Sequence, residues 1–269
     1  MAGRFEGKVA CITGLARGQG RSHALALAAE GADIIGLDLC APVGWTTYPG
    51  SSPEDLDETV RQVEALGRRV VARQGDVRDP ASLQALLDAG LQELGRLDIV
   101  VANAGVGRIN AWDDTSAQVW QDTIDINLTG SWNTVMATAP LLAQSGGGSV
   151  ILISSSGGLK SHPFMVPYTA SKFGITGMAK AFAQELAPLH IRVNSIHPGG
   201  VDTPMARGAD DIEALMAKNP QLAGTFANLQ QVDLLPPEDI SRVVLFLASE
   251  DARHVTGSAM VVDAGATAL

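Results

Sequence analysis

Short apolar runs recur along the chain and alternate with longer stretches in which apolar residues are three or four positions apart. Continuous apolar runs are typical of strands that are buried on both faces of a parallel sheet. The strand-like runs cover residues 8–12, 33–38, 70–72, 97–101, 149–153, 192–196 and 260–262. Helical spacing separates most of them, as in residues 54–66, where Leu56, Val60, Val63 and Leu66 would share one face.

This alternation predicts an α/β fold: a single doubly wound parallel sheet of about seven strands with helices on both faces, forming one domain over residues 1–269. In such a sheet the carboxyl ends of the strands meet at one edge, and ligands bind beyond that edge. Polar residues stand at five of these strand ends, namely Asp38, Asp76, Asn103, Ser155 and His197. We therefore expect one ligand site at this edge.

Composition narrows the class of protein further. A hydrophobic content of 46% with 4% aromatic residues suits a sheet built from Val, Ile, Leu and Ala. The formal net charge is −10 and no basic block is present, which argues against nucleic acid and membrane surfaces as partners. Cys11 and Cys40 form no metal motif, so no metal is expected. Because we find no leader and no apolar stretch of membrane length, we expect a cytoplasmic protein.

A glycine-rich turn separates the first strand-like run from a helix expected over about residues 22–30. It reads Thr13-Gly14-Leu15-Ala16-Arg17-Gly18-Gln19-Gly20, with the spacing Gly-x-x-x-Gly-x-Gly. In a strand–turn–helix unit, such glycines let the backbone approach a dinucleotide pyrophosphate, and the helix N-terminus favours its charge. Glycines also serve plain turns, so the triplet alone is a weak signal.

Asp38 ends the second strand-like run and bears on the choice of cofactor. A carboxylate at this position accepts hydrogen bonds from the adenosine ribose hydroxyls and repels a 2′-phosphate, which favours NAD over NADP. Arg17 argues the other way, since a basic residue in the loop can pair with that phosphate. Arg17 can equally face solvent or pair with Asp38. No Lys or Arg closely follows Asp38, and NAD is therefore the predicted cofactor.

Tyr168 and Lys172 are four residues apart, and Ser155 lies thirteen residues before the tyrosine. On a helix this spacing places both side chains on one face. A lysine ammonium favours the phenolate, so we expect a lowered pKa for Tyr168. A serine hydroxyl can hold the substrate oxygen while the tyrosine exchanges a proton with it. Alone, the pair would more often be an ordinary surface pair, but its occurrence with the glycine loop predicts acid–base chemistry beside a nucleotide.

Over essentially its full length, the chain resembles the short-chain dehydrogenase/reductase family, whose fold is a Rossmann-type sheet. Motifs of this family occur here in the same order. They are Thr13-Gly14-x-x-x-Gly18-x-Gly20, Asp76-Val77, Asn103-Ala104-Gly105, Asn127, the trio of Ser155, Tyr168 and Lys172, and Pro198-Gly199 with Thr203. Ser154 and Ser156 compete for the serine role, but the offset from Tyr168 favours Ser155.

The resemblance implies a role for each matched residue. Tyr168 exchanges the proton, Lys172 lowers its pKa and binds the nicotinamide ribose, Ser155 orients the substrate oxygen, and Asn127 supports a proton relay. The implied NAD contacts are Gly14, Arg17, Gly18, Gln19, Gly20, Asp38, Leu39, Asp76, Val77, Asn103, Ala104, Gly105, Tyr168, Lys172, Pro198, Gly199, Val201 and Thr203. The implied reaction is hydride transfer between a secondary alcohol and its ketone. Apolar positions in residues 115–142 and 168–186, with the resemblance, imply a homotetramer or a dimer.

Residues 39–53 exceed what a helix and a strand between Asp38 and Asp76 require. With residues 17–23 and 71–79, this insertion resembles the mycofactocin-associated dehydrogenases of actinobacteria, a group that includes carveol dehydrogenase-like enzymes. The resemblance implies that the insertion covers bound NAD, which mycofactocin would then reoxidise. We expect Val43, Trp45 and Tyr48 to provide the cover. A plain surface loop is the alternative.

Substrate selection is expected from residues 204–235, from Trp112 and from the loop of residues 159–166. Six apolar residues would form a lid over a hydrophobic, cyclic or terpene-like alcohol, or would simply pack on the sheet: Met205, Leu215, Met216, Leu222, Phe226 and Leu229. We expect His197 to be packed or hydrogen-bonded, and the role of His162 stays open. A nucleotide sensor without catalysis is the alternative function, because fold alone does not exclude it. The glycine spacing disfavours a third reading, a sugar-nucleotide epimerase.

Overall fold

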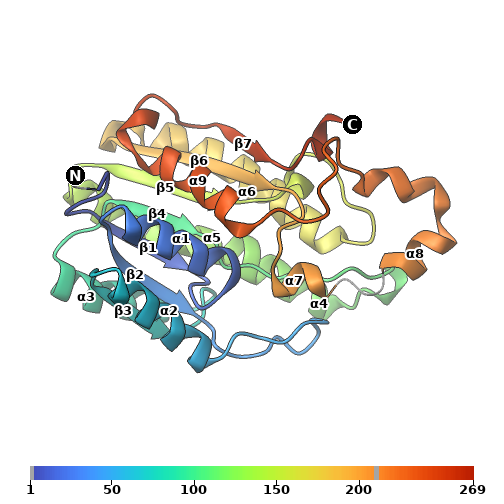
Figure 1. Ribbon diagram of the computed structural model, residues 1–269, viewed down its shortest axis with the longest axis horizontal. Coiled ribbons are helices and arrows are strands. Elements are labelled where there is room, and N and C mark those ends of the chain that lie inside the picture. The colour runs from blue at the N-terminus through green and yellow to red at the C-terminus, as the bar shows by residue number, and fades with distance from the viewer. Residues whose placement is uncertain (1–2, 209–211) are drawn as a thin grey trace.

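The structure, a computed structural model, describes residues 3–208 and 212–269 and contains one seven-stranded sheet between two layers of helices (Figure 1). All neighbouring strands are parallel, in the order β3-β2-β1-β4-β5-β6-β7. The strands are β1 Val9–Thr13, β2 Asp33–Asp38, β3 Val70–Gln74, β4 Ile99–Ala102, β5 Gly148–Ile153, β6 Ile191–Pro198 and β7 Ala259–Val262. The predicted Rossmann-type fold is confirmed, and the predicted strands differ from these only at their ends.

Six helices cover the two faces of the sheet. They are α1 Gly18–Ala29, α2 Pro53–Ala65, α3 Pro80–Leu94, α5 Gly130–Gln144, α6 Val166–Glu185 and α9 Pro237–Ala248. In β1, Ala10 and Ile12 enter the core beneath α1, α2 and α9, whereas Val9 and Cys11 enter the core beneath α3, α5 and α6. Because successive strand residues point to opposite faces and both faces are buried, the strands are apolar throughout.

The remaining elements lie mostly near the carboxyl edge of the sheet. They are the helices α4 Ala117–Thr123, α7 Pro204–Arg207 and α8 Ile212–Lys218, the π-helical turn Ile124–Thr129, and the 3₁₀ turns Trp112–Asp114, Ser156–Gly158, Ala187–Leu189, Pro220–Phe226, Glu250–Ala252 and Ala266–Ala268. The segment predicted for substrate selection thus contains α7, α8 and a 3₁₀ turn, although its residues 209–211 lie outside the described residues. Nowhere in the described chain does a helix have both the length and the apolar character needed to cross a membrane.

Local sequence signals fix where helices α1 and α2 begin, beside the predicted ligand site. Helix α1 begins at Gly18, earlier than predicted, because Gly18 and Gly20 of the glycine-rich turn belong to the first turn of the helix. Helix α2 begins with a capping box, in which the Ser52 hydroxyl accepts from the Asp55 amide and the Asp55 carboxylate accepts from the Ser52 amide. Pro53 occupies the first helical position, where its missing N–H costs nothing. These residues end the insertion.

Candidate active site

Two cavities adjoin the carboxyl edge of the sheet. The first, here the glycine-loop cavity, has a volume of about 220 Å³. Most of the predicted NAD contacts line it: Gly14, Arg17, Gly18, Gln19, Asp38, Leu39, Asp76, Val77, Asn103, Ala104, Gly105, Tyr168, Lys172 and Thr203. The second, here the lid-side cavity, has a volume of about 320 Å³. Ser155, Pro198, Gly199 and Val201 line this second cavity, and Gly20 and Asn127 line neither.

The glycine loop is built for close backbone approach. A Cβ atom at Gly20 would lie 1.9 Å from the Gly14 carbonyl oxygen, so no larger residue fits there. Gly14 itself has φ +71°, a conformation that glycine adopts without strain. The side-chain amide of Asn103 donates to the Thr13 carbonyl at 2.9 Å and fastens the loop to the end of β4. The Thr13 hydroxyl accepts from the Asn103 and Ala104 amides at 3.1 Å, a contact that the sequence did not predict.

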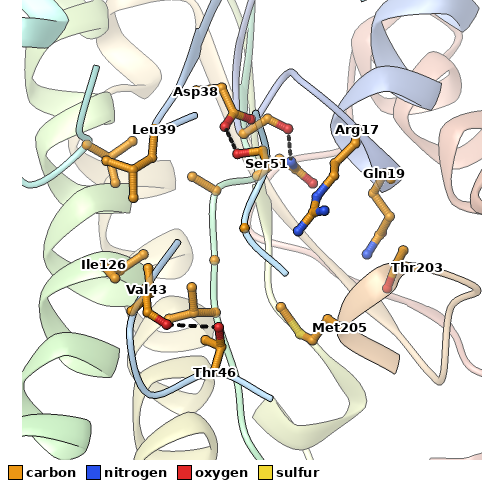
Figure 2. A pocket seen from close by; sticks show the side chains of 18 of the residues that line it. Arg17, Gln19, Asp38, Leu39, Val43, Thr46, Ser51, Ile126, Thr203 and Met205 are labelled. Atoms are coloured by element: carbon orange, nitrogen blue, oxygen red, sulfur yellow. Dashed lines mark hydrogen bonds between the residues drawn. The ribbon is translucent and has the colours of Figure 1, made fainter. Parts of the chain in front are cut away.

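Groups of the chain itself occupy part of the Asp38 carboxylate. Its carboxylate accepts from the Ala16 amide at 2.8 Å, the Cys40 amide at 3.1 Å and the Ser51 hydroxyl at 2.5 Å. Figure 2 shows Asp38 and Ser51 joined at one end of the cavity. A carboxylate offers about four acceptor sites. Asp38 therefore organises the glycine loop and the insertion as well as facing the cavity.

The side walls of the glycine-loop cavity differ in polarity. Arg17 and Gln19 lie on one side, and the apolar side chains of Leu39, Val43 and Ile126 lie on the other (Figure 2). The Gln19 Oε1 atom is buried and has no hydrogen-bond partner among the described residues. Such an orphaned acceptor suits a donor supplied by a ligand.

The insertion is tied to the segments on both sides of the cavities. Figure 1 shows it as the loop that leaves β2 and extends towards α4 and α7. The Thr47 hydroxyl donates to the Gly208 carbonyl at 2.6 Å, and the Tyr48 hydroxyl accepts from the Gly107 amide at 3.3 Å. Thr46 and Tyr48 line the glycine-loop cavity, whereas Thr47 lines the lid-side cavity. The insertion is therefore a wall shared by both cavities.

One prediction about the insertion was wrong, and one of the alternatives left open for Arg17 is not seen. Trp45 does not line the glycine-loop cavity but donates from its indole to Asp122 of α4 at 2.9 Å. Arg17 does not pair with Asp38, because its guanidinium donates to the Pro49 carbonyl of the insertion. In both cases a long-range contact that spacing does not reveal fixes the side chain.

Tyr168 and Lys172 share one face of α6, as predicted. The Lys172 ammonium lies 5.4 Å from the centre of the Tyr168 ring and donates to the Ile153 carbonyl at 2.9 Å. Burial raises the pKa of Tyr168, and a hydrogen bond with the Ser155 side chain only partly opposes this rise. Burial also lowers the pKa of Lys172 to about 8. The expected fall in the tyrosine pKa is thus wrong for the chain by itself, since enclosure disfavours the phenolate more than its neighbours favour it.

Asn127 acts on the backbone around the site. It lies in the π-helical turn between α4 and α5 and is fully buried. Its side chain accepts from the Val106 amide at 2.8 Å and donates to the Val106 carbonyl at 2.9 Å and the Ser171 hydroxyl at 3.1 Å. Asn127 therefore joins the segment after β4 to α6. Its place in a π-helical turn is in keeping with a functional site, where such turns often occur.

The serines on either side of Ser155 and the two nearby histidines make different contacts. The Ser154 hydroxyl donates to the Lys172 carbonyl, and Ser156 lies 3.2 Å from the His162 ring. His197 is buried and hydrogen-bonded to Ser195 and the Ser155 carbonyl, which confirms its packed role. Burial, together with the charge of Lys160, lowers the pKa of His162 to about 4, so that its ring is neutral at physiological pH.

The lid-side cavity is mostly apolar, but not with all the residues predicted. Met205 and Phe226 line it, whereas Leu215, Met216, Leu222 and Leu229 do not. The Trp112 side chain is 81% exposed and lines neither cavity, so its predicted place in the substrate wall was wrong. The cavity is also lined by Lys160, from the loop predicted for substrate selection, and by Arg108, which was not predicted. The signal for Arg108 in the sequence was a basic residue three positions after Asn103-Ala104-Gly105.

The chain is similar in sequence to known proteins over nearly its whole length. A family profile described as enoyl-(acyl carrier protein) reductase matches residues 14–267. A protein of Mycolicibacterium smegmatis named as a short-chain type dehydrogenase/reductase is 51% identical over 98% of this chain and 99% of its own length. The (-)-trans-carveol dehydrogenase of Rhodococcus erythropolis is 44% identical over 98% of this chain and 99% of its own.

A solved structure resembles the fold over nearly its whole extent. The short chain dehydrogenase from Mycobacterium paratuberculosis bound to NAD superposes with a TM-score of 0.96 at 50% identity, covering 99% of this chain and 100% of that one. The seven-stranded sheet and the edge that carries the two cavities thus have a counterpart in a protein crystallised with NAD.

Proposed function

The chain belongs to the short-chain dehydrogenase/reductase family, and from this premise we propose that it is an NAD-dependent enzyme that interconverts a hydrophobic secondary alcohol and its ketone. The position of Tyr168 carries the proposal, because this side chain lines both cavities. Lys172 lines the glycine-loop cavity and Ser155 the lid-side cavity. The groups suited to proton transfer therefore lie between a site for a nucleotide and a site for a substrate.

The residues of the glycine-loop cavity fit NAD. Gly14 and Gly18 line the cavity without a side chain, and Arg17 gives α1 no side-chain cap, so that first-turn N–H groups are available to a pyrophosphate. The buried Gln19 Oε1 atom suits a donor on the ligand. Asp38 would repel a 2′-phosphate, which favours NAD over NADP. The related structure bound to NAD supports the same choice.

We propose that Tyr168 is the acid–base residue. When bound, NAD supplies the hydride acceptor for oxidation or, in reduced form, the donor for reduction. Tyr168 would take the alcohol proton while Ser155 holds the same oxygen, and Lys172 would favour the phenolate. Asn127 would position the segment after β4 through Val106. Since burial raises the pKa of Tyr168, the protonated form that serves ketone reduction predominates at neutral pH, and alcohol oxidation should accelerate as pH rises.

The apolar lid-side cavity supports a hydrophobic, cyclic or terpene-like substrate, as does the similarity to a carveol dehydrogenase. The insertion supports a second proposal, that NAD is held through turnover and reoxidised by mycofactocin. Its contacts to Asp122, Gly107 and Gly208 would have to break before a covered nucleotide leaves.

We propose that the enzyme assembles as a homotetramer or a dimer. Large apolar side chains remain exposed on α4, α5 and α6: Trp120 at 43%, Trp132 at 46%, Met136 at 50% and Phe173 at 46%. Exposed apolar residues that gather on neighbouring helices are typical of interfaces between protomers.

Turnover by the purified protein tests the function. With carveol or cyclohexanol and an artificial electron acceptor, we expect oxidation to the ketone. Tyr168→Phe should lower kcat by about 10²- to 10⁴-fold, the usual contribution of a general acid–base group. NAD binding, measured by calorimetry, should stay unchanged, because the ring is retained. NAD binding without turnover of any secondary alcohol would instead favour the nucleotide sensor.

A further inference from the structure

Two basic side chains line the lid-side cavity of a chain whose formal net charge is −10. Arg108 belongs to the segment after β4, and Lys160 belongs to the loop between the 3₁₀ turn Ser156–Gly158 and α6. Apolar residues such as Met165 and Phe226 form much of the remaining wall. A wholly apolar alcohol would make no polar contact with these two cations, whereas an anionic group on the ligand would.

Arg108 is incompletely paired. Its Nη2 atom donates to the Asp114 carboxylate at 3.3 Å, longer than the roughly 2.7–2.9 Å of a good charge-assisted hydrogen bond. The Asp114 side chain is 66% exposed, so this ion pair is well solvated. The Arg108 Nε atom is buried and has no hydrogen-bond partner among residues 3–208 and 212–269. A guanidinium carries five N–H donors, so the single long bond to Asp114 leaves donors at the guanidinium end for an acceptor from a ligand.

The other described titratable groups around this cavity do not place a buried negative charge beside the two cations. The Lys160 ammonium contacts the Ala266 carbonyl, which satisfies a donor but does not neutralise the charge. The His162 ring is neutral at physiological pH, as described above. Asp233 is the acidic side chain among the described lining residues, and it is exposed to solvent. A ligand in the cavity thus meets Arg108 and Lys160, while the two nearby carboxylates, Asp114 and Asp233, are both exposed to solvent.

Arg108 is fixed close to the reacting end of the cavity. It directly follows Gly107, which packs so tightly on Tyr168 that a Cβ atom there would lie 2.9 Å from the Tyr168 Cδ2 atom. The Gly107 amide is also held by the Tyr48 hydroxyl of the insertion. The backbone that carries Arg108 is therefore constrained from two sides. One small molecule can then contact both the tyrosine and the arginine.

Building on the proposed function, we propose that the substrate is a hydroxy acid: a hydrophobic ring with a secondary alcohol at Tyr168 and Ser155 and a carboxylate bound by Arg108. Carboxylate oxygens match the planar donors of a guanidinium, and Lys160, which lines the same cavity, adds favourable potential. Arg108 would be a specificity-determining residue, because it contacts the substrate away from the reacting carbon. The reaction itself is unchanged, with the hydroxyl proton passing to Tyr168 and the hydride to NAD.

Paired substrates test this proposal. The unmodified enzyme, loaded with NAD and an artificial acceptor, is compared on 3- and 4-hydroxycyclohexanecarboxylate and on the corresponding neutral carboxamides. We expect a higher kcat/KM for the acids. Arg108→Leu should lower kcat/KM for the acids by about 10- to 100-fold, the value of a hydrogen bond to a charged group, and should change the carboxamides by less than about twofold. Arg242→Leu, which removes an arginine of α9 that pairs with Asp239, is the control and should change neither.

A binding measurement separates this proposal from the function on which it rests. The non-reactive cyclohexanecarboxylate should raise the melting temperature of the NAD-loaded enzyme more than cyclohexanecarboxamide does, and Arg108→Leu should abolish the difference. Lys160→Met should reduce the preference for acids and provides a second variant if Arg108→Leu does not fold. Turnover of both substrate types without preference, or equal losses on both in Arg108→Leu, would overturn the hydroxy-acid proposal alone. Selective binding of the acid without turnover would overturn the dehydrogenase function instead.

Discussion

Lys172 is buried, and its ammonium contacts the Ile153 carbonyl at 2.9 Å. Burial lowers its pKa to about 8, whereas a lysine in an unfolded chain titrates near 10.4. Between these values the unfolded state binds more protons, so the contribution of this group to stability rises with pH and is least favourable below about pH 8. The residue proposed to favour the phenolate therefore makes the folded chain less stable at neutral pH than at alkaline pH.

This linkage can be measured with Lys172→Met. From about pH 8 to pH 10, we expect the free energy of unfolding of the unmodified protein to rise by about 2 kcal/mol relative to the variant, at roughly 1.4 kcal/mol per pH unit. Urea unfolding at several pH values provides the comparison. Lys180→Met, which removes an exposed lysine of the same helix, is the control and should show no such trend. A difference between Lys172→Met and the unmodified protein that does not vary with pH would contradict the expectation.

Asp38 governs a second prediction at this scale. Asp38→Ala should weaken NAD binding and narrow the preference for NAD over NADP, because it removes both the repulsion of a 2′-phosphate and the hydrogen bonds to the Ala16 and Cys40 amides. Ser51→Ala removes a hydrogen bond to the same carboxylate but keeps its charge, so the preference should remain. Calorimetry gives the Kd values of NAD and NADP for each protein. Equal Kd values for the unmodified protein would refute the role of Asp38 in selecting NAD.

At the scale of elements, the insertion joins parts of the chain that are distant in sequence. Trp45 contacts α4, Thr47 contacts the residue after α7, and Tyr48 contacts the segment after β4. Since its last residues, Ser52 and Pro53, start α2, the insertion is anchored at that end by a capped helix. Such an anchored insertion should change the dissociation rate of a ligand that it covers more than the association rate.

We therefore expect cofactor release to depend on these anchors. Trp45→Phe should speed NAD dissociation about fivefold, the value of one hydrogen bond of about 1 kcal/mol, and replacing residues 40–50 by a tight turn should speed it further. Trp112→Phe is the matched control, because that exposed indole lines neither cavity. Stopped-flow release of NAD measures the rates. Rapid, saturable turnover of the unmodified enzyme with free NAD would show that the insertion does not retain the nucleotide.

At the scale of the whole molecule, the exposed apolar residues of α5 and α6 bear on assembly. Light scattering at micromolar concentration should show a tetramer or a dimer. Trp132→Glu combined with Phe173→Glu should shift the protein to a smaller species, because each charge would be buried without a partner at the interface. Leu66→Glu is the control, since Leu66 is 46% exposed beyond the end of α2. A monomeric unmodified protein would rule out this assembly.

The sequence by itself determined the fold and most of the residues at its carboxyl edge. A sheet buried on both faces requires continuous apolar strands, and those runs are visible directly, as in residues 33–38. The glycine loop and the pair of Tyr168 and Lys172 are local as well, because spacing along one turn or one helix face fixes which groups meet. Parallel strands then bring such local motifs to one edge whatever the loops between them do.

Only the tertiary structure decided the partners and the ionisation of these groups. Trp45 meets Asp122, and Arg17 meets Pro49, through contacts between segments that the chain brings together only on folding. The raised pKa of Tyr168 likewise depends on how completely packing encloses the phenol, which outweighs the hydrogen bond with Ser155. The unpaired Nε atom of Arg108 was equally hidden, because burial and hydrogen-bond geometry arise from the whole fold rather than from residue spacing.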